Sequence, residues 1–344
     1  MLDDARIREI ACASLLCDVR LPEARDTEFG PLYLREGVAP EDLSRYLCAI
    51  GSFDGLHAGH RELLRSAAES ARAKGLPFVA ITFSPDPSEV LSAQSPRKLL
   101  SNDERVRTLA AAAPDAVFAV RFTRELAGLS YREFVERVLG SIGAPAAIHV
   151  GADFALGARR AGNVAALTEL GREQGFVVCG HELVRIDGAP VTSTRIRGLI
   201  EEGAVDAASR LLLRHHRLSG EVIHGRGEGA SLGFATANID LDPAFCLPAE
   251  GVFAALAVHD GVAWPSAVNI GPARSFDSGD RTLAEAHLLS FAGDLYGEEL
   301  TLIFLAHLRA PMTFSGLEEF KRVIDGNVEW VQTNISDHSV EVRP

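Results

Sequence analysis

The chain has 344 residues, of which 47% are hydrophobic and 24% charged, the proportions of a folded globular protein with about two domains. Its 34 basic and 47 acidic side chains give a formal net charge of −13, which excludes a protein that wraps nucleic acid nonspecifically, because phosphate neutralisation needs a basic face. The sequence contains no apolar run near the roughly 18 residues of a membrane span. We therefore expect a soluble, cytoplasmic protein without nucleic-acid or membrane partners.

The five cysteines are an odd number without a C-x-x-C pair, and they are Cys12, Cys17, Cys48, Cys179 and Cys246. This usage is typical of free thiols in a reducing compartment rather than of a metal site.

Residues 1–44 are weakly patterned and rich in charge and proline, and we interpret them as an extension or a lid. From Tyr46 onward, buried strands alternate with amphipathic helices. The expected strands are 46–51, 77–83, 115–122, 146–151 and 176–184, and the expected helices are 59–75, 101–113, 131–139 and 163–174. Strands that alternate with helices of about ten residues predict an α/β fold with a parallel, doubly wound sheet.

A different pattern begins near Leu218, where short apolar runs are broken by Gly, Pro and Asp. This pattern predicts an antiparallel barrel or sandwich, with a helix at 316–324 packed on it. A helical bridge at 201–217 separates the two patterns. We therefore predict an extension over 1–44, one domain over 45–210 and another over 217–344.

The segment GSFDGLHAGH (51–60) joins the first strand of the alternating region to its first helix. Gly51, Gly55 and Gly59 let the backbone turn tightly near a phosphate, and the helix start offers free N–H groups to an anion. His57 and His60 lie three positions apart, so both imidazoles can face the same phosphate during nucleotidyl transfer. The alternative is a pair of exposed histidines beside ordinary turn glycines.

A second polar cluster, VTSTRIRGLIEEG, covers residues 191–203. Its hydroxyls are ordinary helix N-caps when taken alone. Arg195 and Arg197 follow immediately, so hydroxyls and guanidinium groups come together as a triphosphate requires. Between the two clusters, GADFALGARRAG (151–162) ends another expected strand. Arg159 and Arg160 are either a solvated pair or part of the rim of an active site.

GSFDGLHAGH, TFSPDP (82–87), GADFALG and TSTRIR, in this order and spacing, resemble the FMN adenylyltransferase module of prokaryotic bifunctional riboflavin kinase/FAD synthetases. H-x-G-H alone also occurs in pantetheine-phosphate and nicotinate-mononucleotide adenylyltransferases. The resemblance implies a Rossmann-like α/β nucleotidyltransferase that converts ATP and FMN to FAD and pyrophosphate with Mg²⁺.

The resemblance also implies roles for individual residues. It assigns catalysis to His57, His60 and Arg197. It assigns ATP contacts to Gly51, Phe53, Asp54, Gly59, Ser193, Thr194 and Arg195, and flavin contacts to Asp153 and Phe154. Ser52 stands where the family usually has Asn, and Asp86 where it usually has His. Asp86 adds negative charge beside a site for polyanions.

The second half resembles a riboflavin kinase domain, a six-stranded antiparallel β-barrel. The resemblance rests on GRGEGASLGFATANID (225–240), NIGPARSF (269–276), AEAHLLSF (284–291) and DLYG (294–297). It implies that Thr236 and Asn238 bind Mg²⁺ and ATP, and that Glu285 is the general base toward riboflavin.

This half departs from the family pattern at more positions. Ala235 replaces Pro, Ala230 replaces Arg, Ala273 and Arg274 alter the N-I-G-x-R-P motif, and Ser290 replaces Asp. We therefore expect riboflavin phosphorylation to be impaired or lost, with FMN adenylylation the stronger activity. The alternatives are a barrel kept for oligomer contacts or flavin binding, a paralogue acting on a flavin analogue or another nucleotide, and a non-catalytic flavin-binding regulator. A homo-oligomer is compatible with each.

Overall fold

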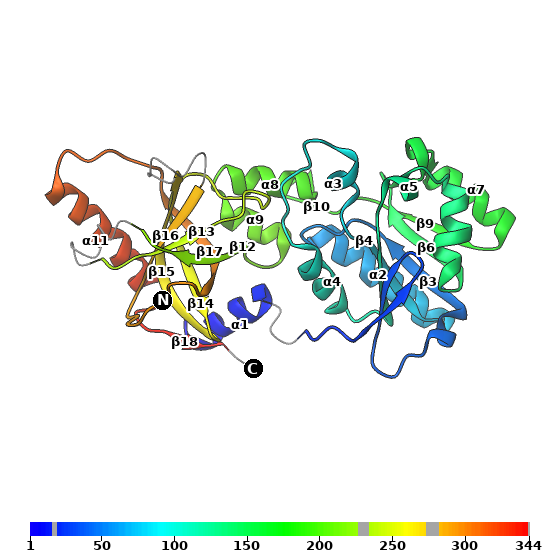
Figure 1. The fold of residues 1–344 in the computed structure, drawn as a ribbon, viewed down its shortest axis with the longest axis horizontal. Helices are drawn as coiled ribbons and strands as arrows, with labels where there is room; N and C mark the ends of the chain where they lie inside the picture. Colours follow the sequence, from blue (N-terminus) through cyan, green and yellow to red (C-terminus); the bar gives the residue numbers. More distant parts are fainter. Residues whose placement is uncertain (16–18, 226–233, 273–281, 343–344) are drawn as a thin grey trace. The chain divides into compact units, whose positions relative to one another are not determined.

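The computed structural model describes residues 1–15, 19–225, 234–272 and 282–342 (Figure 1). The chain divides into two compact units. The α/β unit comprises Val19–Ser193, and the barrel unit comprises Met1–Asp18 together with Thr194–Pro344.

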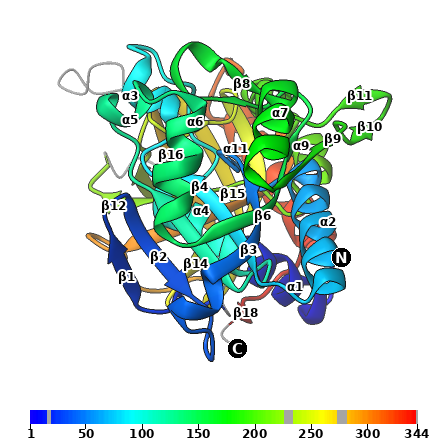
Figure 2. The same ribbon diagram turned by 90° about the vertical axis from the view of Figure 1, so that its right-hand side faces the viewer.

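The α/β unit is built on a seven-stranded sheet in the order β1-β2-β5-β4-β3-β6-β9 (Figure 2). The strands are β1 (Ala24–Thr27), β2 (Gly30–Leu34), β3 (Arg45–Ile50), β4 (Phe78–Phe83), β5 (Ala116–Val120), β6 (Ala144–Gly151) and β9 (Val177–His181). β5, β4, β3, β6 and β9 pair in parallel, which confirms the predicted α/β fold. The β1–β2 hairpin adds an antiparallel edge next to β5, and the sequence analysis did not foresee it.

Helices cover both faces of this sheet. They are α2 (Ala58–Lys74), α3 (Pro87–Leu91), α4 (Asn102–Ala110), α5 (Arg124–Ala127), α6 (Tyr131–Glu133) and α7 (Val164–Gln174), with short turns η1 (Pro40–Ser44), η2 (Phe134–Val138), η3 (Leu139–Ser141) and η4 (Ala158–Arg160). α2 and α4 bury apolar side chains against one face, whereas η2, η3 and α7 do so against the other. Two small hairpins complete the unit: β7 (Ala155–Leu156) with β8 (Gly162–Asn163), and β10 (Arg185–Ile186) with β11 (Ala189–Pro190).

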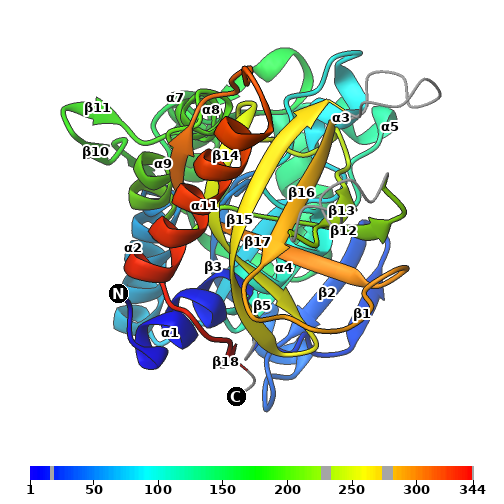
Figure 3. The same ribbon diagram turned by 90° about the vertical axis from the view of Figure 1, so that its left-hand side faces the viewer.

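Six strands of the barrel unit close on themselves (Figure 3). They are β12 (Arg217–Ile223), β13 (Ala237–Asp240), β14 (Gly251–His259), β15 (Val262–Pro272), β16 (Thr282–Leu288) and β17 (Glu299–Arg309). Their order is β14-β17-β12-β13-β16-β15, and β15 pairs back onto β14. This closed antiparallel ring is the six-stranded barrel that the resemblance implied.

The outside of the barrel carries its own apolar layer. Helices α1 (Asp4–Leu15) and α11 (Leu317–Asn334), and strand β18 (Val340–Glu341), pack there against outward-facing side chains of β14, β15 and β17. α1 holds the C-terminal segment directly: the Arg8 side chain donates to the Glu341 carbonyl, and the Leu2 amide donates to the Ile335 carbonyl. Residues 1–15 therefore form part of the barrel unit.

Helices α8 (Ser193–Glu201) and α9 (Val205–Leu212) occupy the expected bridge. Val205 belongs to the barrel core, and α9 packs on β17. By packing, residues 194–212 thus belong with the barrel, whereas the sequence analysis assigned residues up to 210 to the first domain. The boundaries of independently folding domains stay a proposal, which fragment experiments test below.

Several predicted elements differ in length. α11 continues ten residues past the expected end at Ile324, through Gly326, with Val331 fully buried against the barrel. The helix expected over 131–139 is divided into α6, the π-turn η2 and the 3₁₀ turn η3. The Ser101 capping box is present as predicted and begins α4.

Candidate active site

The turn between β3 and α2 places both histidines of the H-x-G-H motif at a helix start. His57 is the N-cap residue of α2, and its Nδ1 accepts the backbone N–H of His60 at 3.3 Å. Phe53 and Leu56 have positive φ angles of 53° and 38°, so the backbone turns sharply before the helix. The N–H···Nδ1 bond leaves the proton of a neutral His57 on Nε2, which is therefore a donor.

The two imidazoles stack on each other. Their ring centroids are 3.6 Å apart with an interplanar angle of 16°, and Phe53 meets His60 edge-on at 5.3 Å. Burial, followed by the neighbouring His57, lowers the pKa of His60 well below its usual range, so His60 is neutral at pH 7. His60 Nδ1 is buried and has no hydrogen-bond partner among the described residues.

Gly59 is required by the position of the His57 ring. A Cβ at residue 59 would lie 3.2 Å from His57 Cε1 and 3.5 Å from the Val191 carbonyl oxygen. A side chain at residue 59 would therefore press on the His57 ring, whereas its distance to the Val191 carbonyl is an ordinary contact.

Hydrogen bonds join the motif to three distant segments. Thr82 Oγ1 donates to the Ser52 carbonyl at 3.1 Å, and Ser193 Oγ donates to the Asp54 carbonyl at 2.8 Å. The Asp54 carboxylate accepts the backbone N–H groups of Leu99 and Leu100, each at 3.2 Å. The structure thus brings GSFDGLHAGH, TFSPDP and the start of TSTRIR together, as the sequence predicts. Asp54 and Ser193 are occupied in building the turn.

The predicted flavin residues follow β6, whose carboxyl end lies beside that of β3. Asp153 is exposed and Phe154 is half-buried against the core, while Arg160 donates to the Asp153 carbonyl at 3.5 Å. Parallel sheets bind ligands at this edge, where adjacent strands end.

Beyond Ser193, the remaining TSTRIR residues lie in the barrel unit. Thr194 is exposed, and Arg195 and Arg197 are half-buried on α8. The Arg197 carbonyl accepts the Cys246 thiol at 3.7 Å. The roles of these side chains toward ATP stay predictions.

In the barrel, Asn238 and Glu285 are directly opposite each other on β13 and β16, and Glu285 is also opposite Asn269 on β15. Ala284 and Ala286 point into the core, so Glu285 and its two partners lie on the outer face. Glu285 and Asn269 are exposed and Asn238 is half-buried, while Thr236 is exposed just before β13. A Cβ on Gly225 would lie 2.1 Å from Asn238 Nδ2, so a side chain at residue 225 would displace this amide.

Family models match both halves of the chain. The model described as FAD synthetase covers residues 39–195, and the model described as riboflavin kinase covers residues 212–335. A solved structure entitled a macrolide-efflux protein from Streptococcus pneumoniae superposes with a TM-score of 0.76 and 26% identity, over 85% of this chain and 95% of that one. No helix in the described part of the present chain is long and apolar enough to cross a membrane.

Curated relatives extend over both halves. A bifunctional riboflavin kinase/FMN adenylyltransferase from Pseudomonas fluorescens is 35% identical over 282 residues, which cover 82% of this chain and 90% of that protein. The Escherichia coli K12 protein of the same name is 34% identical over 277 residues, covering 80% and 88%. The chain belongs to the bifunctional riboflavin kinase/FMN adenylyltransferase family. It is an enzyme of FAD biosynthesis, as the FAD synthetase match over the α/β unit requires.

The negative charge of Asp86, which stands where this family usually has His, is compensated by a buried arginine. Asp86 is the N-cap of α3, and its carboxylate lies 3.5 Å from the guanidinium of Arg105, a residue that is 2% exposed. Arg105 also donates to the Phe83 carbonyl and to Asn102 Oδ1. The ion pair offsets the negative charge that the sequence analysis placed beside the site.

Two of the departures in the riboflavin kinase half, Ala235 and Ser290, lie among the described residues. Ala230, Ala273 and Arg274 lie outside the described residues. The Ala235 carbonyl accepts a hydrogen bond from His287 Nδ1 at 2.8 Å. Ser290 Oγ donates to the Asp337 carbonyl at 3.0 Å. Ser290 is thus accommodated by a hydrogen bond of its own side chain, whereas nothing in the structure explains the alanine at 235.

Sequence reasoning missed three groups of residues near these sites. They are Arg105, Asn269, and the His149–His181 pair, in which Nδ1 and Nε2 are 2.9 Å apart. Only Asn269 had a sequence signal, because it begins the N-I-G motif. Arg105 and the two histidines acquire their partners through tertiary contacts, which no local pattern reveals.

Proposed function

We propose that the α/β unit transfers the adenylyl group of ATP to FMN. A phosphate oxygen of FMN attacks the α-phosphorus, the bond from that phosphorus to the oxygen bridging to the β-phosphate breaks, and pyrophosphate leaves. The stacked His57–His60 pair at the start of α2, with its buried and unpartnered His60 Nδ1, carries this proposal. Fixed donors at a helix start are suited to charge that develops on a transferring phosphoryl group.

The low pKa of His60 specifies how the pair acts. Two stacked imidazoles do not both carry charge, so they serve as neutral hydrogen-bond donors when the nucleotide arrives. The nucleotide's negative charge then favours protonation of His60, because an adjacent anion stabilises an imidazolium. We assign Gly51, Phe53, Asp54 and Gly59 to shaping this turn.

The proposed flavin contacts are Asp153 and Phe154, at the carboxyl end of the strand beside β3. Thr194, Arg195 and Arg197 are proposed to contact the ATP phosphates, on the strength of their match to the T-S-T-R-I-R motif. The Arg197→Gln variant tests the last assignment: we expect a raised KM for ATP, because a charge-assisted hydrogen bond to phosphate is lost.

The histidine assignment is tested by FAD formation from FMN and ATP with Mg²⁺, resolved by chromatography. His60→Ala should lower kcat by about 10²–10³, the usual cost of losing one transition-state donor. His338→Ala, which removes an exposed imidazole of the barrel unit, is the control and should keep full activity. Unchanged turnover in a folded His60→Ala protein would refute the role of the motif.

We propose further that the barrel unit phosphorylates riboflavin. The ribityl hydroxyl oxygen attacks the γ-phosphorus of ATP, ADP leaves, and the hydroxyl proton passes to the Glu285 carboxylate. The alignment of Asn238, Glu285 and Asn269 on one outer face supports this assignment, because a carboxylate beside amide groups can orient a hydroxyl nucleophile.

Mg²⁺ fits the residues assigned to it. Thr236 offers a hydroxyl and Asn238 an amide oxygen, both hard donors of the kind that this ion prefers. When bound, Mg²⁺ neutralises negative charge on the ATP phosphates.

Riboflavin phosphorylation is tested by FMN formation at saturating ATP and Mg²⁺, compared with FAD formation from FMN. Glu285→Gln should abolish FMN formation and leave FAD formation unchanged, whereas Glu299→Gln on β17 is the matched control. The expectation of a weakened kinase stays a prediction, and phosphorylation as fast as adenylylation would contradict it. A protein that binds flavins and forms neither product would instead be a regulator.

A further inference from the structure

Arg61, which follows His60 in the first turn of α2, is a half-buried arginine. Its Nε is closed off from solvent and has no hydrogen-bond partner among the described residues. Nor does any carboxylate or carbonyl in the described part of the chain bind the remaining N–H groups of the guanidinium. Because an arginine stays protonated in a protein, Arg61 is a cation whose donors the described residues leave unused.

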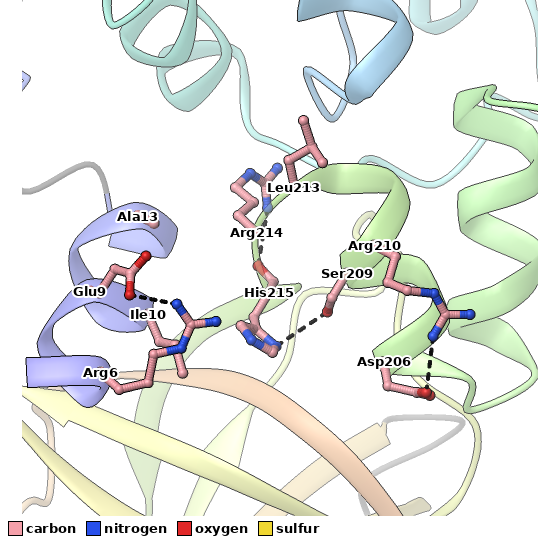
Figure 4. Close-up of a pocket in the computed structure, with 10 residues that line it drawn as sticks. All are labelled: Arg6, Glu9, Ile10, Ala13, Asp206, Ser209, Arg210, Leu213, Arg214 and His215. Atoms are coloured by element: carbon pink, nitrogen blue, oxygen red, sulfur yellow. Dashed lines mark hydrogen bonds and ion pairs between the residues drawn. The ribbon is translucent and has the colours of Figure 1, made fainter. Parts of the chain in front are cut away.

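Several arginines elsewhere in the molecule are paired with carboxylates. Arg65, one turn further along α2, binds both Glu62 and Glu69. A cavity of about 330 Å³ between α1 and α9 is lined by two such pairs (Figure 4), which are Arg6–Glu9 at 2.5 Å and Arg210–Asp206 at 3.6 Å. Burial lowers the pKa of Arg61, whereas its two carboxylate partners raise the pKa of Arg65. Burial therefore disfavours the charge of Arg61, and no carboxylate among the described residues offsets that effect.

Arg61 is placed beside the histidine pair of the H-x-G-H motif. Its backbone N–H donates to the His57 carbonyl at 3.0 Å, so it lies one helical turn after the N-cap. His60, the preceding residue, has a buried Nδ1 that is also without a partner in the described ranges. Two successive residues at this helix start thus contain buried nitrogen atoms without hydrogen bonds. Such groups destabilise the free protein, and a bound ligand that accepts their hydrogen bonds removes the cost.

We propose that Arg61 binds a phosphoryl group of a substrate of adenylyl transfer. A guanidinium fork matches phosphoryl oxygens in geometry and charge, and the first turn of a helix favours an anion. The inference rests on the adenylyl transfer proposed for the α/β unit. The phosphoryl group belongs either to ATP or to FMN, and the kinetic test distinguishes the two.

The kinetic test compares Arg61→Met with the wild-type protein in FAD formation from FMN and ATP. We expect the KM for ATP or for FMN to rise about tenfold or more, because a charge-assisted hydrogen bond is lost. The substrate whose KM rises is the one that Arg61 binds. Arg61→Lys should recover part of the loss, because it keeps the charge without the fork. Arg72→Met, at an exposed position of the same helix, is the control and should keep both KM values.

Denaturant unfolding separates substrate binding from a structural role. Without substrates, Arg61→Met should be at least as stable as the wild type, because it removes an unpaired charge and breaks no ion pair. A loss of stability with unchanged KM values would overturn the proposal, since it would show that Arg61 acts only in packing.

A site-resolved measurement does not require turnover. The modification of Arg61 by phenylglyoxal in the full-length protein is followed by peptide mass spectrometry, with inorganic pyrophosphate, ATP or FMN added. At least one of these anions should protect Arg61, whereas Arg72 should react equally in all samples. Protection in a protein that forms no FAD would refute adenylyl transfer and retain the anion contact. FAD formation without protection, and with unchanged KM values in Arg61→Met, would refute the contact alone.

Discussion

Arg105 shows how a single buried charge can compensate a carboxylate, Asp86, that we place beside the proposed ATP site. Its guanidinium neutralises Asp86, and both Asp86 and Asp54 oppose the effect of burial, which lowers the Arg105 pKa. Breaking a buried ion pair leaves one charge without compensation, at a cost of up to about 3–5 kcal/mol. We expect Arg105→Met to lower the free energy of unfolding by about 2–3 kcal/mol and to raise the KM for ATP.

The double variant Arg105→Met/Asp86→Asn separates electrostatics from packing. If the uncompensated Asp86 charge is the cause, the double variant should recover the KM for ATP while remaining less stable than the wild type. Steady-state kinetics and denaturant unfolding on the same preparations decide this. A KM that stays high in the double variant would show that Arg105 acts through the shape of the loop.

The His149–His181 pair makes stability depend on pH. Burial, followed by the nearby His181 and Lys74, lowers the pKa of His149 from 6.5 to about 4. Between these values the unfolded chain binds a proton that the folded protein excludes, so stability falls as the pH falls from 6.5 to 4. The loss is at most about 3 kcal/mol, at about 1.4 kcal/mol per pH unit.

Denaturant unfolding measured between pH 7 and 4 tests this dependence. His149→Gln should flatten the decline over that interval, because glutamine does not titrate there, whereas His259→Gln, at a half-buried position of β14, should leave the slope unchanged. A His149→Gln profile parallel to that of the wild type would place the sensitivity at other groups.

At the scale of elements, α1 is a structural part of the barrel unit. Ile7 is fully buried in the layer that α1 shares with β14 and α11. Ile7→Ala should therefore lower the free energy of unfolding by about 2–5 kcal/mol, as for other core truncations. Leu317→Ala, at a side chain that is 58% exposed on α11, should change it by less than about 0.5 kcal/mol. Equal effects in denaturant unfolding would contradict the docking of α1.

Helices and strands were predicted well from the sequence where their hydrophobic periodicity was strong. They were predicted poorly where tertiary contacts determine whether an element forms or where it ends. The buried strands from Tyr46 onward and the Gly75 end of α2 were evident, because apolar runs and a left-handed cap are local signals. α1 was missed because its apolar face is short and interrupted by charges. The sequence predicts that α11 ends at Ile324, because Gly326 disfavours a helix. In the structure the helix continues, because burial of Val331 outweighs the helix-propensity cost of the glycine, about 1 kcal/mol.

The same limit applies to the candidate sites. The H-x-G-H turn was predictable because a strand, glycines and a helix start coincide within ten residues. The neutral state of the histidine pair was not, because it follows from burial and from a stacking distance of 3.6 Å. The compensation of Asp86 depends on Arg105, which is distant in sequence and meets it only after α4 packs.

At the scale of the whole molecule, two divisions of the chain compete. The sequence places the first domain at 45–210, whereas packing groups Val19–Ser193. A fragment of residues 19–193 contains both apolar layers of its sheet, so we expect it to melt cooperatively. A fragment of residues 1–215 carries α1 and α9 without the barrel that covers Ile7 and Val205.

We expect the longer fragment to bind a hydrophobic dye and to aggregate on heating, because these apolar faces lack their partners. Calorimetry and dye fluorescence on both fragments test the division. A soluble 1–215 fragment with a cooperative transition and no dye binding would favour the sequence-based boundary.

The attachment of α1 to the C-terminal segment also bears on how a ribosome delivers this protein. Arg8 and its acceptor Glu341 are 333 positions apart, so α1 contacts α11 and β18, which are translated long after it. At roughly 5–20 residues per second, Ile7 and Ile10 wait at least about 15 seconds for their partners. The entire α/β unit is synthesised in that interval and can fold, while the barrel acquires its outer layer only after α11 and β18 have left the ribosome.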